Sequence, residues 1–342
     1  MSGGVDSSAA ALLLMQQGYE VTGCTMRLFG EELAGTKCGS LSGIADAKAV
    51  CDTLGIEHIT ADFSKCFAEN VCRPFASDYI RGITPNPCVM CNKKLKFGKM
   101  LSYAIEQGFD YVATGHYAGM SYNGEKKRFE LLRSPDHSKD QSYVLYNITQ
   151  EQAAHILFPL YGYSKPELRV IAGQAGLVTA QKADSQDICF IPDGDHAQFI
   201  ARFTGHEDKK GSFIDKDGNV LGEHGGITRY TIGQRRGLGI ALGLPVFVTA
   251  KDAVSNTVTL GDESELMQSR LRLKCVNMIN MEQPPMRVTA KVRYNSKDVP
   301  AALYRTEDGY IIEFDEGVRA PAAGQSCVFY DGERVVGGGI IV

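Results

Sequence analysis

The segment Ser2-Gly3-Gly4-Val5-Asp6-Ser7-Ser8 constrains the fold of this chain more than any other part of its sequence. Its two glycines let the backbone turn tightly and approach a ligand closely, because they lack a Cβ atom. A run of strong helix formers follows at residues 9–15, and Gly18 ends it. A Gly/Ser loop at a helix start is an anion site, since unpaired N–H groups and the helix dipole both point at the charge. The segment therefore predicts a phosphate-binding loop.

The loop lacks the Gly-Lys-Ser/Thr sequence in which a lysine holds the outer phosphates. Its order, SGGxDS, resembles the pyrophosphatase loop of enzymes that split ATP into AMP and pyrophosphate. Such a loop normally follows a strand, and here Met1 directly precedes it. We expect the native sequence to continue upstream for about ten mostly β-branched and apolar residues, enough for a strand of roughly five or six.

Composition limits the classes of protein and partner. A chain of 342 residues has room for two or three domains, and its net charge of −4 provides no general basic surface, so nucleic-acid contacts have to come from local patches. The sequence has no signal peptide and no apolar run of about eighteen residues, which indicates a cytoplasmic protein without a membrane partner. Ten cysteines in that compartment favour thiol chemistry or a metal site over a disulfide scaffold.

Strand and helix patterns alternate in the first part of the chain and indicate parallel βαβ units. Strands are expected at residues 20–26, 56–61 and 111–114, and helices at 44–54 and 94–107. The fold class is therefore α/β, with a doubly wound parallel sheet over residues 1–199 and a helical elaboration at about 150–176. A small glycine-rich central domain is expected at 200–244 and a C-terminal β-barrel at 245–342, with strands at 246–248, 257–260, 288–294 and 335–342.

The second chemical cluster is Thr84-Pro85-Asn86-Pro87-Cys88-Val89-Met90-Cys91. Cys91 is expected just before a helix that carries Lys93, Lys94 and Lys96. A helix start and nearby ammonium groups both favour a thiolate, so we expect a lowered pKa and good nucleophilicity for Cys91. The C-x-x-C spacing also fits half of a zinc site, but no second ligand pair is found in the sequence to complete it.

The third cluster, Asp184-Ser185-Gln186-Asp187-Ile188-Cys189-Phe190-Ile191, contains one cysteine between apolar residues. Taken alone, Cys189 has the surroundings of a core residue. The seven histidines form no ligand pair, and only His116, which follows Gly115, is expected near a nucleotide. We treat the remaining cysteines as packing or incidental thiols: Cys24, Cys38, Cys51, Cys66, Cys72, Cys275 and Cys327.

Together the clusters resemble the tRNA 2-thiouridylases, the bacterial and organellar enzymes that replace O2 of the wobble uridine with sulfur. Seven motifs carry the resemblance along the whole chain: SGGVDSS, TPNPCVMCNKKLKFG, ATGHYA, KDQSYVL, DSQDICFI, YTIGQRRGLG and KVRYNS. The resemblance implies ATP contacts at Ser2, Gly3, Gly4, Val5, Asp6, Ser7, Met26 and Gly115. It implies that Cys91 is the nucleophile and Cys189 the persulfide carrier. It places contacts with the target base or the rest of the tRNA at Asn86, Pro87, Cys88, Lys139, Asp140, Gln141, Arg293 and Tyr294.

The implied reaction begins with adenylation of the uridine at O2, with pyrophosphate leaving and Mg²⁺ neutralising the phosphates. Sulfur then arrives from a persulfide on Cys189, and Cys91 cuts the S–S bond by thiol–disulfide exchange. AMP departs and a Cys91–Cys189 disulfide remains. The implied partners are the wobble-uridine tRNAs for Glu, Gln and Lys and a persulfide donor such as a cysteine desulfurase or a sulfur-relay protein.

The chain departs from the family pattern at Cys88, where many members have an aspartate three residues before the nucleophile. A third cysteine opens an alternative in which Cys88, Cys91 and Cys189 hold three irons of a 4Fe–4S cluster. A ligase or amidotransferase with the same loop is a second alternative, and an iron–sulfur RNA-binding protein without catalysis is a third.

The expected tRNA contacts rest on local basic patches. Over residues 287–294, Arg287, Lys291 and Arg293 share one strand face while Val288, Ala290 and Val292 share the other. Such a face is also typical of a simply solvated strand. Tyr294 is placed to stack on a base splayed out of a single-stranded loop, and residues 234–236, Gln-Arg-Arg, form a second candidate phosphate clamp.

Overall fold

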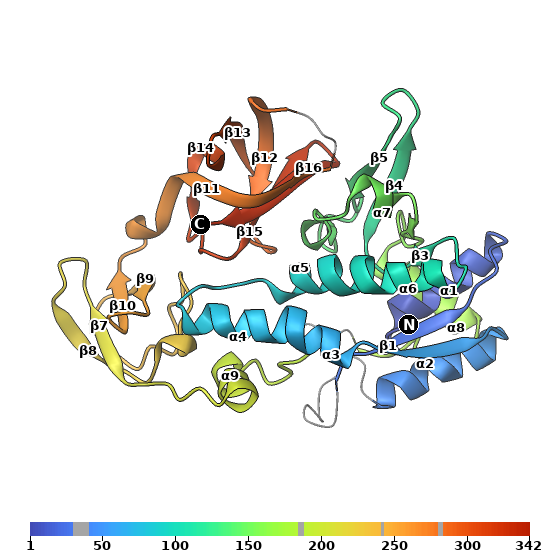
Figure 1. Cartoon of the computed structure of the whole chain (residues 1–342), viewed down its shortest axis with the longest axis horizontal. Coiled ribbons are helices and arrows are strands. Elements are labelled where there is room, and N and C mark those ends of the chain that lie inside the picture. The colour runs from blue at the N-terminus through green and yellow to red at the C-terminus, as the bar shows by residue number, and fades with distance from the viewer. Residues whose placement is uncertain (30–40, 184–187, 241–242, 280–282) are drawn as a thin grey trace. The chain divides into compact units, whose positions relative to one another are not determined.

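The computed structural model describes residues 1–29, 41–183, 188–240, 243–279 and 283–342 (Figure 1). Asp184, Ser185, Gln186 and Asp187 of the third motif lie outside the described residues, as does Cys38. Contacts divide the chain into two compact units. Unit 1 contains residues 1–71, 88–194 and 333–335, and unit 2 contains 72–87, 195–332 and 336–342.

Unit 1 contains two pairs of parallel strands. Strands β1 (Gly23–Arg27) and β2 (His58–Asp62) pair in parallel register, with Gly23 opposite His58, and helix α2 (Leu41–Leu54) connects them. Strands β3 (Val112–Ala113) and β6 (Ile156–Leu157) form the second parallel pair. Parallel strands joined through helices confirm the predicted α/β class.

The rest of unit 1 is mostly short. A hairpin of β4 (Ala118–Asn123) and β5 (Arg128–Arg133) follows the first parallel strands in the sequence. The other elements are α3 (Ser64–Phe67), the π-helix η2 (Ala68–Cys72), the 3-10 helix η4 (Ser142–Val144), α7 (Gln150–Ala153) and α8 (Lys165–Gln174). Helix α8 begins with a capping box, in which Ser164 and Glu167 satisfy each other's backbone amides.

Helix α1 (Val5–Gln16) is buried on two sides, and this burial positions the segment that precedes it. On one side Ala9, Ala10 and Leu13 pack with Leu160 and Leu168. On the other side a second cluster surrounds its first turn, formed by Val5, Val50, Ala172, Leu177 and Ala180. Each buried Leu or Val side chain contributes about 1.5–3 kcal/mol, so the start of α1 is held firmly.

The helix that follows the C-x-x-C motif starts earlier than the sequence predicted. Instead of beginning at Lys94, it begins at Pro87 and runs without a break through α5 (Pro87–Cys91), the π-helix η3 (Asn92–Lys99) and α6 (Met100–Glu106). Proline is tolerated at the first helical position, where its missing N–H has no partner to lose. The predicted start was wrong because proline is compatible with both an extended segment and a helix start.

Unit 2 contains a helical pair and a small sheet. Helices α4 (Arg73–Ile80) and α9 (His196–Thr204) meet through Phe75 and Phe199, whose ring centroids lie 6.1 Å apart. The sheet has the order β8 (Val220–His224), β7 (Gly211–Ile214), β10 (Thr257–Gly261), β9 (Phe247–Asp252), and the 3-10 helix η5 (Ile227–Arg229) lies against its core. The sequence grouped β9 and β10 with the C-terminal barrel, whereas β10 pairs in parallel with β7. The boundary expected at residue 245 therefore falls inside this sheet.

The C-terminal strands of unit 2 close into a six-stranded barrel, drawn in orange and red in Figure 1. The order is β11 (Met267–Met278), β14 (Gly309–Arg319), β13 (Val299–Thr306), β12 (Met286–Lys291), β15 (Ser326–Asp331) and β16 (Arg334–Ile341), after the 3-10 helix η6 (Ser264–Leu266). Strand β16 pairs back onto β11, which closes the barrel. Val288 and Ala290 point into its core while Arg287 is exposed, as the alternation predicted. None of the helices within the described ranges combines the length and the hydropathy that a membrane span requires.

Gly98 is required by the wide turn of η3. A Cβ atom at this position would lie 2.9 Å from the carbonyl oxygen of Lys93, five residues earlier. We expect Gly98→Ala to destabilise unit 1 by about 1–3 kcal/mol, because that backbone oxygen cannot move aside without opening the helix. Thermal denaturation measures the effect.

Gly173→Ala is the matched control, because Gly173 lies inside α8 and a Cβ atom there meets nothing within 4 Å. Alanine favours a helix interior over glycine by up to about 1 kcal/mol, so this variant should melt at or above the wild-type temperature. Equal melting temperatures for the two variants would contradict the requirement for glycine at position 98.

Candidate functional site

The predicted phosphate loop has a specific backbone geometry. Gly3 adopts a φ of +68°, and a Cβ atom there would lie 2.5 Å from the carbonyl oxygen of Gly43, so only glycine fits. Gly4 is extended, with φ −112° and ψ 163°, a conformation open to any residue. Gly4 also provides no side-chain cap for α1, whose first-turn amides lie beside the loop. Of the two glycines, only Gly3 is required by the turn itself.

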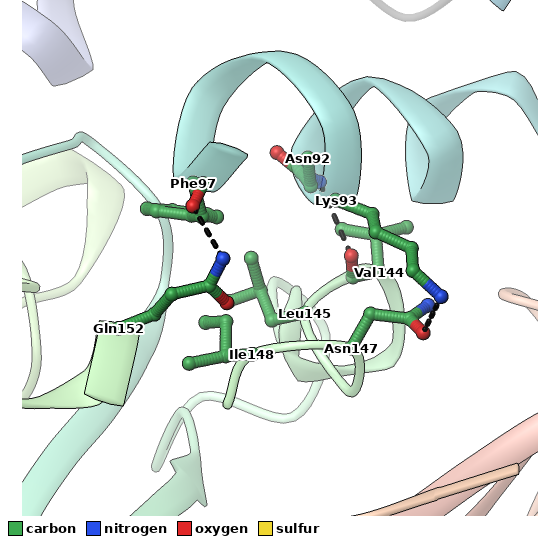
Figure 2. Close-up of a pocket in the computed structure, with 8 residues that line it drawn as sticks. All are labelled: Asn92, Lys93, Phe97, Val144, Leu145, Asn147, Ile148 and Gln152. Carbon is green, nitrogen blue, oxygen red and sulfur yellow. Dashed lines mark hydrogen bonds between the residues drawn. The ribbon is translucent and has the colours of Figure 1, made fainter. Parts of the chain in front are cut away.

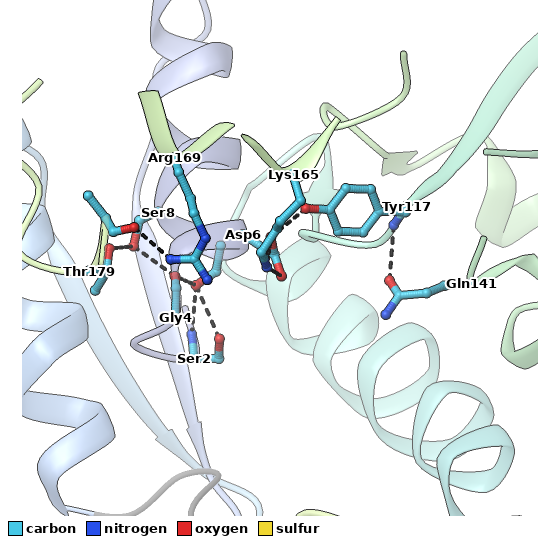
Figure 3. Close-up of polar contacts among 11 residues, drawn as sticks. Ser2, Gly4, Asp6, Ser8, Tyr117, Gln141, Lys165, Arg169 and Thr179 are labelled. Atoms are coloured by element: carbon cyan, nitrogen blue, oxygen red, sulfur yellow. Dashed lines mark hydrogen bonds and ion pairs between the residues drawn. The ribbon is translucent and has the colours of Figure 1, made fainter. Parts of the chain in front are cut away.

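Serine hydroxyls hold the loop closed on itself. The Ser2 amide donates to Ser7 Oγ over 3.1 Å, and the Ser7 and Ser8 hydroxyls donate to the Gly4 carbonyl over 3.1 and 2.9 Å. Thr179 from a distant part of unit 1 donates to Ser8 Oγ over 2.9 Å. Figure 3 shows Ser2, Ser8 and Thr179 gathered at the start of α1. The loop is therefore organised before any ligand binds.

Asp6 faces a lysine that the sequence analysis did not identify. Lys165 Nζ lies 2.7 and 2.8 Å from the two carboxylate oxygens of Asp6, and the Tyr117 hydroxyl donates to Asp6 Oδ1 over 2.7 Å (Figure 3). Only 11% of the Lys165 side chain is exposed, so the ion pair is largely withdrawn from water. The capping box at Ser164 predicts a helix start here, but no local pattern reveals that the helix delivers Lys165 to Asp6.

Gly115 and Met26 are two other residues expected to contact the nucleotide. A Cβ atom on Gly115 would lie 2.7 Å from the Asp6 carbonyl carbon, so Gly115 permits close contact with the loop. Met26 lies near the C-terminal end of β1, opposite Ala61 of β2. Ligands of α/β sheets bind at the carboxyl ends of parallel strands, which is the edge Met26 occupies. ATP contact by these residues stays a prediction.

The Lys139-Asp140-Gln141 segment divides into three different environments. Lys139 is exposed. Asp140 is buried, and its carboxylate accepts from the Ser134 and Ser142 amides at 3.1 Å each. Gln141 Oε1 accepts from the Tyr117 amide over 3.0 Å (Figure 3). Asp140 and Gln141 therefore hold the backbone of the segment, and a tRNA contact by Lys139 stays a prediction.

The side chain of His116, which the sequence places near the nucleotide, is buried. Its Nε2 lies 3.3 Å from Lys96 Nζ and its Nδ1 2.7 Å from the Thr114 hydroxyl oxygen. An ammonium group can only donate, so Nε2 accepts and Nδ1 carries the proton. Burial, with the Lys96 charge adding to it, holds the pKa of His116 well below its usual range. The imidazole is therefore neutral at physiological pH.

Polar contacts made by residues that follow Cys91 anchor its helix to the rest of unit 1. Figure 2 shows Asn92, Lys93 and Gln152 at this interface. The Asn92 amide donates to the Val144 carbonyl over 3.2 Å, Lys93 Nζ to Asn147 Oδ1 over 3.0 Å, and Gln152 to the Phe97 carbonyl over 2.6 Å. Lys93 is thus engaged with an amide oxygen. Cys88 and Cys91 lie three residues apart in this helix, so both thiols share one face.

The three candidate thiols differ in exposure. Cys88 is exposed, while Cys91 and Cys189 are half-buried. Phe190, the neighbour of Cys189, is fully buried and makes an edge-to-face contact with Phe67 at 5.5 Å. Phe190 therefore fixes the segment that contains Cys189 within unit 1. Within the described ranges, no group of three His, Cys, Asp or Glu side chains is arranged to hold a metal ion.

Other cysteines lie in environments that suppress their reactivity. Burial raises the pKa of the Cys24, Cys51 and Cys327 thiols above the usual value. A thiol kept protonated is a poor nucleophile. These three fit the packing role expected for them.

The basic side chains expected on one strand face are less available than the sequence indicates, and β12 ends at Lys291, so Arg293 lies beyond the strand. Arg293 donates from Nη2 to the carbonyls of Ile232 and Ala320 over 2.8 and 2.6 Å. Arg287 forms an ion pair with Asp315, and Lys291 lies 4.0 Å from Asp298. The carboxylates come from other segments of the barrel, so the strand sequence alone could not show them. Tyr294 is 38% exposed, and its stacking on a base stays a prediction.

Comparisons with known proteins assign families to three segments. Residues 1–193 match the family described as tRNA methyl transferase HUP domain, and residues 197–262 the tRNA methyl transferase PRC-barrel domain. Residues 268–341 match the aminomethyltransferase beta-barrel domain. The chain is similar over its full length to proteins named tRNA-specific 2-thiouridylase MnmA. That of Acetivibrio thermocellus is 48% identical, with 100% of this chain and 97% of the relative covered.

The corresponding protein of Clostridioides difficile is 46% identical, with 100% of this chain and 96% of the relative covered. Among solved structures, the U34-tRNA thiolase NcsA from Methanococcus maripaludis, which contains a 4Fe–4S cluster, is 17% identical with a TM-score of 0.36. The match covers 60% of this chain and 68% of the thiolase chain.

The neutral state of His116 makes stability depend on pH. Its folded pKa lies below the unfolded value of 6.5, so only the unfolded chain takes up this proton as the pH falls below that value. We expect the melting temperature to fall between about pH 6.5 and 5, and less steeply in His116→Gln, which has no imidazole to charge. His155→Gln removes an exposed imidazole as the control. Parallel curves for wild type and His116→Gln would contradict the assignment.

Proposed function

This chain belongs to the family of tRNA-specific 2-thiouridylases, and on that premise we propose that it activates the wobble uridine with ATP before a cysteine persulfide replaces O2. The protein is a tRNA sulfurtransferase, and the proposal concerns how it works. The observation that carries it is the loop at the start of α1, where Gly3 turns in the left-handed region and α1 presents its first-turn amides. That arrangement favours a polyphosphate anion.

The first step uses the loop to bring the α-phosphate of ATP to O2 of uridine. The uridine oxygen attacks the α-phosphorus, an O–P bond forms, and pyrophosphate leaves. Amides of the loop stabilise the charge that develops on the phosphate oxygens. Mg²⁺ accompanies the triphosphate, and because Asp6 is engaged by Lys165 and Tyr117 we derive no step through a protein-bound metal ion.

The second step transfers sulfur. The terminal sulfur of a Cys189 persulfide attacks C2 of the adenylated base, and AMP leaves with the former O2. The Cys91 thiolate attacks Cys189 Sγ, and the electron pair of the broken S–S bond stays on the transferred sulfur. The product is a Cys91–Cys189 disulfide, which a dithiol reductant returns to two thiols. The half-buried position of both cysteines supports this assignment, because each is accessible yet shielded.

The substrates and partners follow from this chemistry. A wobble uridine lies in a single-stranded loop and has to be splayed out to be reached. We assign base contact to Asn86, Pro87 and Cys88, and phosphate contact to Lys139. The tRNAs for Glu, Gln and Lys in the cytoplasm are the proposed substrates, and a persulfide donor such as a cysteine desulfurase or a sulfur-relay protein supplies the sulfur.

Single cysteine variants separate the two half-reactions. We expect Cys189→Ser to lose thiolation but still release pyrophosphate from ATP when tRNA is added, because adenylation precedes sulfur transfer. Mass spectrometry of the tRNA nucleosides should then detect adenylated uridine. Cys275→Ser removes an exposed thiol of the barrel and should retain full activity. If Cys189→Ser thiolates tRNA at the wild-type rate, or if wild type releases no pyrophosphate, the proposed order is wrong.

Cys88 distinguishes the persulfide route from the iron–sulfur alternative. A persulfide needs only Cys91 and Cys189, so Cys88→Ser should keep substantial thiolation activity. Anaerobically purified wild type should show no absorbance of an iron–sulfur cluster. Complete loss of activity in Cys88→Ser, together with such absorbance in the wild type, would favour the cluster and contradict the persulfide route.

A further inference from the structure

A turn anchored on helix α1 delivers a second lysine to the phosphate loop. Thr179 donates to Ser8 Oγ of α1 over 2.9 Å, and Arg169 from α8 donates to the Ala180 carbonyl over 2.7 Å. Figure 3 shows Thr179 and Arg169 beside Ser8. The Lys182 amide then donates to the Thr179 carbonyl over 3.0 Å. The backbone of Lys182 is therefore fixed with respect to the loop.

The side chain of Lys182 ends on the loop itself. Its Nζ donates to the Gly3 carbonyl over 2.7 Å and forms an ion pair with Asp46 of α2. Gly3 is the residue whose left-handed turn shapes the loop. A positive charge thus lies beside the amides that are expected to receive phosphate.

Exposure separates this lysine from the other one near the loop. Lys165 is 11% exposed and bonds both oxygens of Asp6, whose side chain is 34% exposed, so moving it would break a two-oxygen ion pair that is largely shielded on the lysine side. The side chains of Lys182 and Asp46 are 43% and 40% exposed. An exposed ion pair contributes little to stability, and its ammonium is therefore available to a stronger anion.

We propose that Lys182 binds the pyrophosphate portion of ATP, in place of the lysine that the loop sequence lacks, and that Asp46 is its partner when no nucleotide is present. The inference rests on the proposed use of ATP at this loop. The pyrophosphate portion carries most of the negative charge of ATP, so a single cation contributes most there. Binding moves the ammonium from one carboxylate to phosphate oxygens that accept several charge-assisted hydrogen bonds.

Equilibrium titration tests this without reference to turnover. ATP and inorganic pyrophosphate are titrated by calorimetry into wild type and Lys182→Gln. We expect both to bind about ten- to a hundredfold more weakly to the variant, the size of a lost charge-assisted hydrogen bond. AMP should bind the two proteins equally, and Lys182→Arg should recover part of the lost affinity. Unchanged pyrophosphate affinity in Lys182→Gln, or an equal loss for AMP, would overturn the proposal.

Asp46→Asn distinguishes a ligand-binding lysine from a structural one. If Lys182 matters only because it ties α2 to the loop, removing Asp46 should weaken ATP binding as Lys182→Gln does. If Lys182 binds phosphate, Asp46 competes with ATP for the ammonium, and Asp46→Asn should bind ATP more tightly. In the Lys182→Gln background the same change should then have a smaller effect, because the competition is gone. Weaker binding by Asp46→Asn alone would refute the phosphate role.

Two further variants complete the design. Lys48→Gln breaks a similar exposed ion pair, in which Lys48 lies 3.0 Å from Asp52 on α2, the helix that carries Asp46. This variant should leave ATP affinity unchanged. Gly3→Ala obstructs the loop directly, since its Cβ atom would meet the Gly43 carbonyl. If wild type binds neither ATP nor pyrophosphate, or if a folded Gly3→Ala binds both normally, the proposed ATP site is wrong. If wild type binds ATP and pyrophosphate, Gly3→Ala does not, and the Lys182 variants bind both with wild-type affinity, the ATP site stands and the inference about Lys182 fails.

Discussion

The two-sided burial of helix α1 is the constraint on which the candidate site depends. Its apolar residues pack with Leu160 and Leu168 on one side and with Val50 and Leu177 on the other. Because α1 cannot shift between these clusters, its first turn and the glycine turn before it have a fixed position. Packing holds the helix in place, and the hydrogen bonds of the loop then orient the residues at its start. The geometry of the proposed phosphate site is therefore a consequence of hydrophobic packing several residues away.

Charges around the loop are arranged by elements that lie far apart in the sequence. Helix α8 brings Lys165 to Asp6, and the turn after α8 brings Lys182 to the Gly3 carbonyl. A loop without its own lysine thus obtains two ammonium groups from one later segment. The first is buried and committed to a carboxylate, while the second is exposed and exchangeable. In the proposed function, the buried cation stays with Asp6 while the exposed one is open to a ligand.

Much of the fold was predictable, because periodicity and end signals are local properties. The parallel pair β1 and β2, helix α2 and the closed barrel follow from patterns in the sequence. The start of the Cys91 helix at Pro87 was not predicted, since proline is compatible with both an extended segment and a helix start. The grouping of β9 and β10 with β7 also escaped prediction, because strand patterns do not reveal pairing partners.

The sequence by itself determined the family, and it predicted the phosphate loop and the roles of Cys91 and Cys189, because these depend on residue types in a fixed order. Tertiary structure decided which polar side chains are already engaged in hydrogen bonds within the protein. Arg293 donates to two carbonyls, Asp140 accepts from two amides, and His116 is hydrogen-bonded to Lys96 and Thr114. Lys165 and Lys182 carry no local signal at all. A side chain's availability depends on partners that folding brings from other segments, and no reading of neighbouring residues contains that information.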